Sequence, residues 1–201
     1  MEPLKLRDIV NVHQAVIFDG SVVNPIQGSY ESRREYNRAL AEALLDPSNL
    51  FTTRDVGFEI WDGLKIKRKN KDFFSLSIPR IVDIRCLSRD DFHVYNELFS
   101  YLKPIGVTNG IFDNSCENGN NDIGLAAFAF LKARDEKRTA FISGDKKLVE
   151  LVGVVAESVT EGVVDNFPCG LAGLNAYYFS QAEKFYSKYD ENNDYILSKV
   201  A

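Results

Sequence analysis

The stretch NNDIGLAAFAFLKARDEKRTAFISGDKKL, residues 120–148, decides the fold class. It predicts an apolar helix over 121–134, a short strand over 139–143 and a short helix over 146–152. A carboxylate stands at each junction, with Asp122 at the opening of the first helix and Asp145 just past the strand. Such residues commonly meet the helix dipole or form turns. Either they only shape the backbone, or they belong to a larger site.

The sequence upstream of this stretch repeats the same alternation. VHQAVIF (12–18) predicts a buried strand that ends at Asp19, and residues 30–45 predict an amphipathic helix. LFTT (50–53) is a brief extended segment, and a capping-box-like pair, Thr52 and Asp55, opens a helix through about residue 65. Glu59 lies beside the apolar seam of that helix.

The remaining segments complete the expected chain. Residues 79–87 predict a strand, 91–102 a helix and 107–121 an Asn/Gly-rich loop without a packable face. Further along, VGVVAESV (152–159) suggests an edge strand, and LNAYYFSQAEKFYSKY (174–189) predicts an aromatic helix followed by a polar tail.

Strands that alternate with helices predict an α/β fold, a three-layer α/β/α sandwich around a mainly parallel sheet. We expect one domain over residues 1–165, which includes the Asn/Gly-rich loop, and a C-terminal helical extension over 166–201. In such sheets ligands bind at the carboxyl ends of the strands. Asp19 and Asp145 each follow a strand, so we expect them to converge there.

Bulk composition limits the class of protein. The 201 residues are 45% hydrophobic and 26% charged, and no apolar run approaches the roughly 20 residues of a membrane span. The N-terminal sequence lacks a secretory pattern, so we expect no signal peptide and no membrane partner. Three dispersed cysteines form neither a disulfide framework nor a CxxC zinc pair, which favours a reducing cytoplasm. A net charge of −5 excludes a global basic field for nucleic acid.

Four acids then form a candidate constellation: Asp19, Glu59, Asp122 and Asp145. Each alone has an ordinary structural explanation as a turn former, a helix-dipole partner or a solvated helix residue. If their elements share one edge of the sheet, four like charges crowd one pocket, and cations have to neutralise them. Ligation by oxygen alone favours Mg²⁺ or Mn²⁺ over zinc. Such ions activate water for displacement at phosphorus.

These segments resemble the motifs of the PIN-domain family, in the family's order over roughly residues 12–152. AVIFDGSVVN (15–24) resembles the first motif, with Asp19 as its acid and Ser21 at its hydroxyl position. LFTTRDVGFEIWDGL (50–64) resembles the second, with Glu59. NDIGLAAFAFLKA (121–133) resembles the third, with Asp122. TAFISGDKKLVEL (139–151) resembles the fourth, with Asp145.

The resemblance implies a metal-dependent endoribonuclease, either a toxin of a toxin–antitoxin pair or an RNA-processing enzyme. It implies that the four acids hold one or two Mg²⁺ or Mn²⁺ ions and that Ser21 and Ser143 support them. RNA is the implied substrate and an antitoxin protein an implied partner. The chain departs from compact members of the family by Gly20, by the Asn/Gly-rich insertion and by its C-terminal extension, for which self-association into a homo-oligomer is one expected role.

Three alternatives stay open. The basic stretch KIKRKNK (65–71), with Lys65, Lys67, Arg68, Lys69 and Lys71, either binds RNA phosphates or is a solvated helix end. A PIN-like module that binds RNA or protein without cutting would carry the same pattern. VIFDG (16–20) also resembles the opening of haloacid-dehalogenase-like phosphatases, but Ser21 stands where that chemistry needs a second acid.

Overall fold

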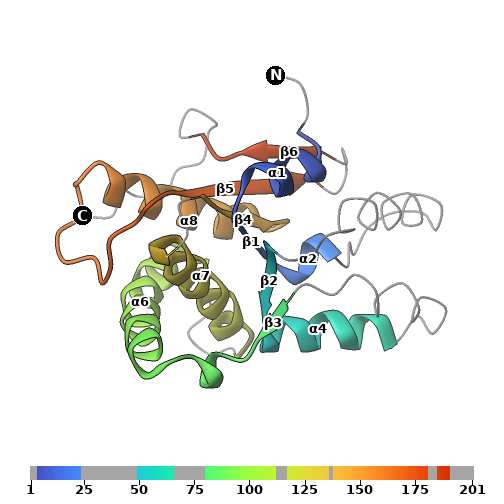
Figure 1. The fold of residues 1–201 in the computed structure, drawn as a ribbon, viewed down its shortest axis with the longest axis horizontal. Helices are drawn as coiled ribbons and strands as arrows, with labels where there is room; N and C mark the ends of the chain where they lie inside the picture. Colours follow the sequence, from blue (N-terminus) through green and yellow to red (C-terminus); the bar gives the residue numbers. More distant parts are fainter. Residues whose placement is uncertain are drawn as a thin grey trace.

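A computed structural model of the chain describes residues 4–23, 49–65, 80–111, 117–135, 138–180 and 185–190. Figure 1 shows a central sheet with helices packed around it. The strands are β1 (Ala15–Phe18), β2 (Leu50–Thr53), β3 (Arg80–Val82), β4 (Thr139–Ser143), β5 (Leu174–Ser180) and β6 (Phe185–Lys188). The helices are α1 (Leu6–Val12), α2 (Gly20–Val23), α4 (Arg54–Lys65), the 3₁₀ turn η3 (Ile84–Cys86), α6 (Arg89–Thr108), α7 (Glu117–Asp135) and α8 (Lys146–Thr160).

The six strands form one mixed sheet in the order β3-β2-β1-β4-β5-β6. All neighbouring pairs are parallel except β5 and β6, which are antiparallel. The expected α/β class with a mainly parallel sheet is therefore confirmed. The chain first adds β2 and β3 on one side of β1 and then returns to add β4 on the other, so the order reverses between β1 and β4.

The core forms around β1, β4 and α7. Every residue of β1 and β4 is buried, so both faces of the sheet are covered at these strands. Within α7 every residue from Ile123 to Leu131 is buried. A helix that is apolar all round belongs in the interior, and α7 contacts strands β1, β2, β4 and β5 as well as α6, beside which it lies in Figure 1.

The prediction of a C-terminal aromatic helix is wrong. Its first part is β5, which pairs in parallel with β4, and its second part is β6, which returns antiparallel beside β5. Tyr177, Tyr178 and Phe179 are β formers whose rings pack well on a pleated sheet, and Phe179 stacks on Tyr186 across the strand pair with ring centroids 4.8 Å apart. Strand pairing therefore outweighs the helix propensity of the sequence between β5 and β6.

Other boundaries also differ from expectation. Residues 152–159 continue α8 as a helix instead of forming an edge strand, because their buried valines fall on the helix face that meets β4 and β5. The segment 79–87 divides into β3 and η3. The expected loop 107–121 is shorter, since α6 extends to Thr108 and α7 begins at Glu117. The expected helix over 30–45 lies outside the described residues.

Candidate functional site

Asp19 and Ser143 meet where the strand order reverses. β1 and β4 run in parallel with Phe18 opposite Ile142, and the backbone N–H of Asp19 donates to the Ile142 carbonyl at 3.0 Å. Asp19 directly follows β1, and Ser143 is the last residue of β4. The carboxyl ends of two parallel strands at such a reversal point are the usual place for a ligand.

Two serines hold the Asp19 carboxylate. The hydroxyl of Ser21 donates to Asp19 Oδ2, and the hydroxyl of Ser143 donates to the same oxygen at 2.7 Å. Each hydroxyl also accepts a backbone N–H, that of Gly144 at 2.8 Å on Ser21 and that of Asp145 at 2.9 Å on Ser143. Asp19 Oδ1 receives no hydrogen bond from the described residues. The network therefore fixes the carboxylate through one of its oxygens at the carboxyl end of β1.

Asp145 is the N-cap of α8. Its Oδ1 accepts the backbone N–H groups of Lys147 at 2.8 Å and Leu148 at 3.3 Å, as a helix cap does. Its side chain is exposed at the end of β4. The structural role expected for an isolated Asp after a strand is thus present, and it employs only one of the two carboxylate oxygens.

Asp122 is the most perturbed acid of the site. It lies in the second turn of α7, five residues after the helix begins at Glu117, so the expectation that it opens the helix is wrong. Burial raises the pKa of its carboxyl to about 7, and repulsion from Asp19, Asp145 and Glu59 adds to the rise. The other three predicted acids therefore all act on Asp122 electrostatically, although they come from separate segments of the chain.

Glu59 joins this group through a residue that the sequence did not single out. The Asn121 side-chain amide donates to Glu59 Oε1 at 2.7 Å, which links α4 to α7. Asn121 directly precedes Asp122, so the same turn of α7 carries both Asp122 and the amide that binds Glu59. The run Asn120-Asn121 carried no signal beyond its loop-like composition, because the contact spans 62 residues.

The four predicted acids offer carboxylate oxygens, the ligand type that hard divalent cations prefer, and burial with like charge raises the pKa of Asp122 among them. Within the described ranges, no three His, Cys, Asp or Glu side chains form a group that could hold a metal ion as they stand. The described acids are therefore near enough for three of them to act on Asp122, but they form no closed cage.

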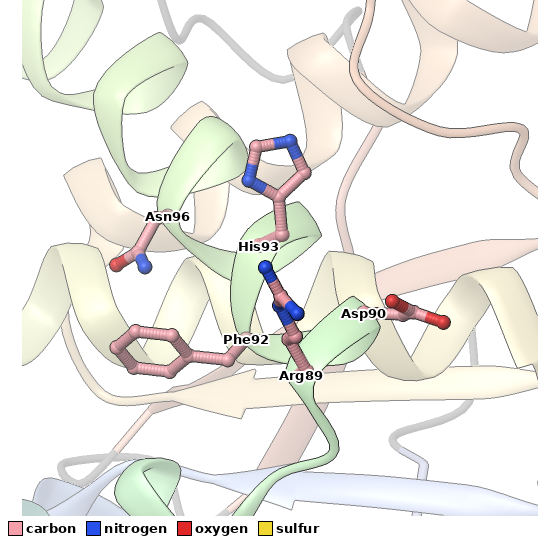
Figure 2. Close-up of a pocket in the computed structure, with 5 residues that line it drawn as sticks. All are labelled: Arg89, Asp90, Phe92, His93 and Asn96. Carbon is pink, nitrogen blue, oxygen red and sulfur yellow. The ribbon is translucent and has the colours of Figure 1, made fainter.

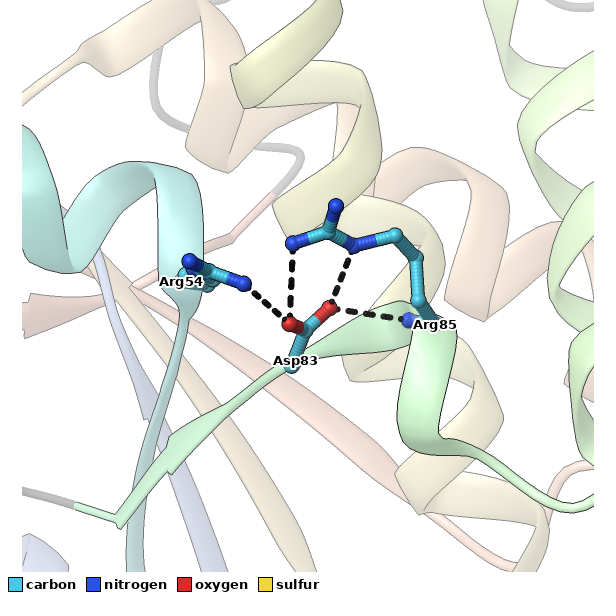
Figure 3. A network of polar contacts seen from close by, with 3 residues as sticks. All are labelled: Arg54, Asp83 and Arg85. Carbon is cyan, nitrogen blue, oxygen red and sulfur yellow. Dashed lines mark hydrogen bonds and ion pairs between the residues drawn. The ribbon is translucent and has the colours of Figure 1, made fainter.

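A basic network continues the same edge of the sheet at β2 and β3. Arg54 follows β2 and Asp83 follows β3, and their side chains meet in an ion pair at 2.5 Å (Figure 3). Arg85 donates from Nε and Nη2 to both Asp83 oxygens, each at 3.0 Å. These hydrogen bonds hold the pKa of the Asp83 carboxyl well below its usual range and raise the pKa of Arg85. The sequence patterns did not point to these residues.

A shallow hollow away from this edge lies on the first turns of α6. It is lined by Arg89, Asp90, Phe92, His93 and Asn96, which all project from the one helix in Figure 2. None of the four predicted acids lines it. His93 instead pairs with Glu97 one turn on, at 3.3 Å.

His13 has a structural role. Its Nδ1–H donates to the Ile9 carbonyl at 2.7 Å, and its Nε2 lies 3.3 Å from the Asn175 amide nitrogen and 3.4 Å from the Tyr177 hydroxyl. Burial lowers the pKa of the ring. The histidine thus ties α1 to β5.

The predicted RNA-binding stretch KIKRKNK falls mostly outside the described residues. Lys65 is the last residue of α4, and Lys67, Arg68, Lys69 and Lys71 lie outside the described residues. No helix in the described ranges has both the length and the apolarity to cross a membrane. Comparison with protein-family models, curated proteins and solved structures found no match to the chain.

Proposed function

We propose that the chain is a divalent-metal-dependent endoribonuclease whose site is formed by Asp19, Glu59, Asp122 and Asp145. The observation that carries the proposal is the effect of three of these acids on the fourth, since Asp19, Asp145 and Glu59 all raise the pKa of Asp122. The four acids come from the end of β1, from α4, from α7 and from the end of β4. Local roles as turn formers and caps do not explain why acids from separate segments lie within electrostatic range of Asp122. The strand order and the order of the motifs support a PIN-like, three-layer version of the α/β fold.

The residues divide into those that would hold the ions and those that position them. The four carboxylates would hold Mg²⁺ or Mn²⁺, which supply activation of water and charge stabilisation at phosphorus. Ser21 and Ser143 orient Asp19, while Asn121 orients Glu59. A cation bound among the four carboxylates would offset the repulsion that raises the pKa of Asp122.

A PIN-like module that binds RNA without cutting is the second candidate, because the described acids form no closed cage. A haloacid-dehalogenase-like phosphatase is less well supported. Its acid/base position holds Ser21, whose hydroxyl is already engaged with Asp19 and the Gly144 N–H. An antitoxin partner, self-association and a cytoplasmic location stay predictions from the sequence.

RNA cleavage separates these candidates. We expect the purified protein to cut RNA with Mn²⁺ or Mg²⁺ and not in EDTA. Asp19→Asn and Asp145→Asn should each lower the cleavage rate by about 100-fold or more. Even the loss of a residue that only hydrogen-bonds to a metal ligand lowers activity by about 10- to 100-fold. Asp165→Asn, an exposed aspartate in the turn after α8, is the matched control and should cut as wild type does. Binding of RNA without cleavage under either metal would favour the binding module.

A further inference from the structure

Phe58 is an exposed aromatic ring beside the candidate site. It directly precedes Glu59 in α4, and 53% of it is exposed. The guanidinium of Arg54 lies over its ring, 5.3 Å from the centroid. Proteins bind single-stranded nucleic acids with exposed aromatic rings, on which the bases stack, and with nearby cationic side chains.

The two neighbouring arginines, Arg54 and Arg85, use only some of their N–H groups to bind Asp83. Arg54 donates from Nη1, and Arg85 donates from Nε and Nη2. Each guanidinium therefore has further N–H groups that contact no acceptor among the described residues. Their side chains are 43% and 72% exposed. Asp83 pairs with both guanidiniums, and Asp55 also acts on Arg85 electrostatically. Asp83 holds the planar forks in place, which suits them to phosphate oxygens.

Phe58, Arg54 and Arg85 lie further along the same edge of the sheet as the four acids. Arg54 and Asp83 follow β2 and β3, which extend the sheet beyond β1 at the same carboxyl edge. Neighbouring strands are about 5 Å apart, so β3 lies roughly 10 Å from β1. An extended strand bound at the acids would reach Phe58 and the arginines within a few nucleotides.

We propose that Phe58, Arg54 and Arg85 form a subsite for single-stranded RNA, in which Phe58 stacks on an unpaired base and the two arginines bind the flanking phosphates. The inference rests on the proposed ribonuclease function, because it takes the bound strand to be substrate. A duplex keeps its bases stacked inside and offers none to the ring, so the subsite selects unpaired RNA. It also places positive charge next to acids that would otherwise repel the backbone.

Binding measured apart from cleavage tests the subsite. Fluorescence anisotropy with a labelled single-stranded RNA in EDTA gives the dissociation constant and its dependence on salt. Phe58→Leu keeps apolar area but removes the ring, and we expect binding to weaken roughly tenfold with an unchanged salt slope. Phe58→Tyr should bind as wild type. Arg54→Gln and Arg85→Gln should weaken binding and lower the salt slope by about 0.7 for each phosphate that the variant no longer neutralises.

Matched controls come from elsewhere in the chain. Phe92→Leu alters another exposed ring, on α6, and Arg138→Gln alters an exposed arginine at the opposite end of β4, and both should bind as wild type. Thermal melting establishes that each variant is folded. No binding by the wild type, equal binding of the duplex, or unchanged affinity in Phe58→Leu and Arg54→Gln would each overturn the subsite. Binding with the expected pattern, but no cleavage with Mn²⁺, would leave the subsite standing and remove the nuclease.

Discussion

Replacing Asp122 with Asn should stabilise the metal-free protein at alkaline pH. The pKa of the Asp122 carboxyl rises from 3.8 to about 7 on folding, first through burial and then through repulsion by Asp19, Asp145 and Glu59. Between these two values the folded chain binds a proton that the unfolded chain has released. Stability from this group is therefore lost as pH rises through that window. Asn does not ionise, so the variant escapes the loss.

The magnitude follows from the size of the shift. A rise from 3.8 to about 7 is roughly three pKa units, which correspond to about 4 kcal/mol at full effect. For a chain of this length, 1 kcal/mol moves the melting temperature by about 2–4 °C. At pH 8 the variant should thus melt on the order of 10 °C above wild type. At pH 4 the two should melt close together, because wild-type Asp122 is protonated there.

Thermal unfolding followed by circular dichroism in EDTA, at pH 4, 6 and 8, measures this difference. Asp165→Asn should melt as wild type at each pH and controls for the loss of a surface charge. Mn²⁺ provides the second arm, since at about 100 times its dissociation constant it should stabilise wild type by about 2.7 kcal/mol and the variant by much less. The reasoning would be refuted if Asp122→Asn were no more stable than wild type at pH 8, or if its advantage did not grow with pH.

Three further substitutions probe the elements that position the site. Ser143→Ala removes a hydrogen bond from both the Asp19 carboxylate and the Asp145 backbone N–H. We therefore expect a loss of about 1–3 kcal/mol in the free energy of unfolding by urea and roughly 10- to 100-fold slower RNA cleavage. Full activity of the variant would contradict the positioning role of Ser143. Gly153→Ala places a Cβ against the ring of Tyr189, closer than van der Waals contact allows. This substitution should lower the free energy of unfolding by about 1–3 kcal/mol in the same assay. Gly170→Ala is the control and should not change it, because a Cβ there meets nothing within 4 Å. The lowered pKa of His13 means that wild-type stability is complete above about pH 6.5 and falls as pH drops below it; His13→Phe should flatten that part of the urea-midpoint profile, and an unchanged profile would contradict the role of burial.

The sequence was most informative where local pattern and tertiary environment agree. TAFIS is β4 with the expected bounds, since this short apolar run between Arg138 and Gly144-Asp145 is buried on both faces. The placement of Asp19 and Asp145 after two strands followed from the rule that parallel strands present their carboxyl ends together, whereas Ser143 came from the resemblance to the PIN-domain motifs. The hydrogen bond between Asp19 and Ser143 joins residues 124 positions apart.

It was least informative where partners distant in sequence decide the outcome. The β5 and β6 segments contain residues compatible with a helix, and only their pairing with β4 and with each other makes them strands. Asn121 and Asp83 gain their roles from Glu59, Arg54 and other side chains that no local period reveals. The helix α1 did carry a signal, an apolar i, i+3, i+4 pattern that buries Leu6, Ile9 and Val10.

The central claim is that four carboxylates from separate segments form one divalent-cation site. Anomalous diffraction from a crystal of the protein grown with Mn²⁺ tests it most directly, because the signal locates the ion without reference to activity. We predict an anomalous peak within ligand distance, about 2.0–2.6 Å, of carboxylate oxygens of Asp19 and Asp122. A peak elsewhere in the molecule, or none at saturating Mn²⁺, would contradict the claim.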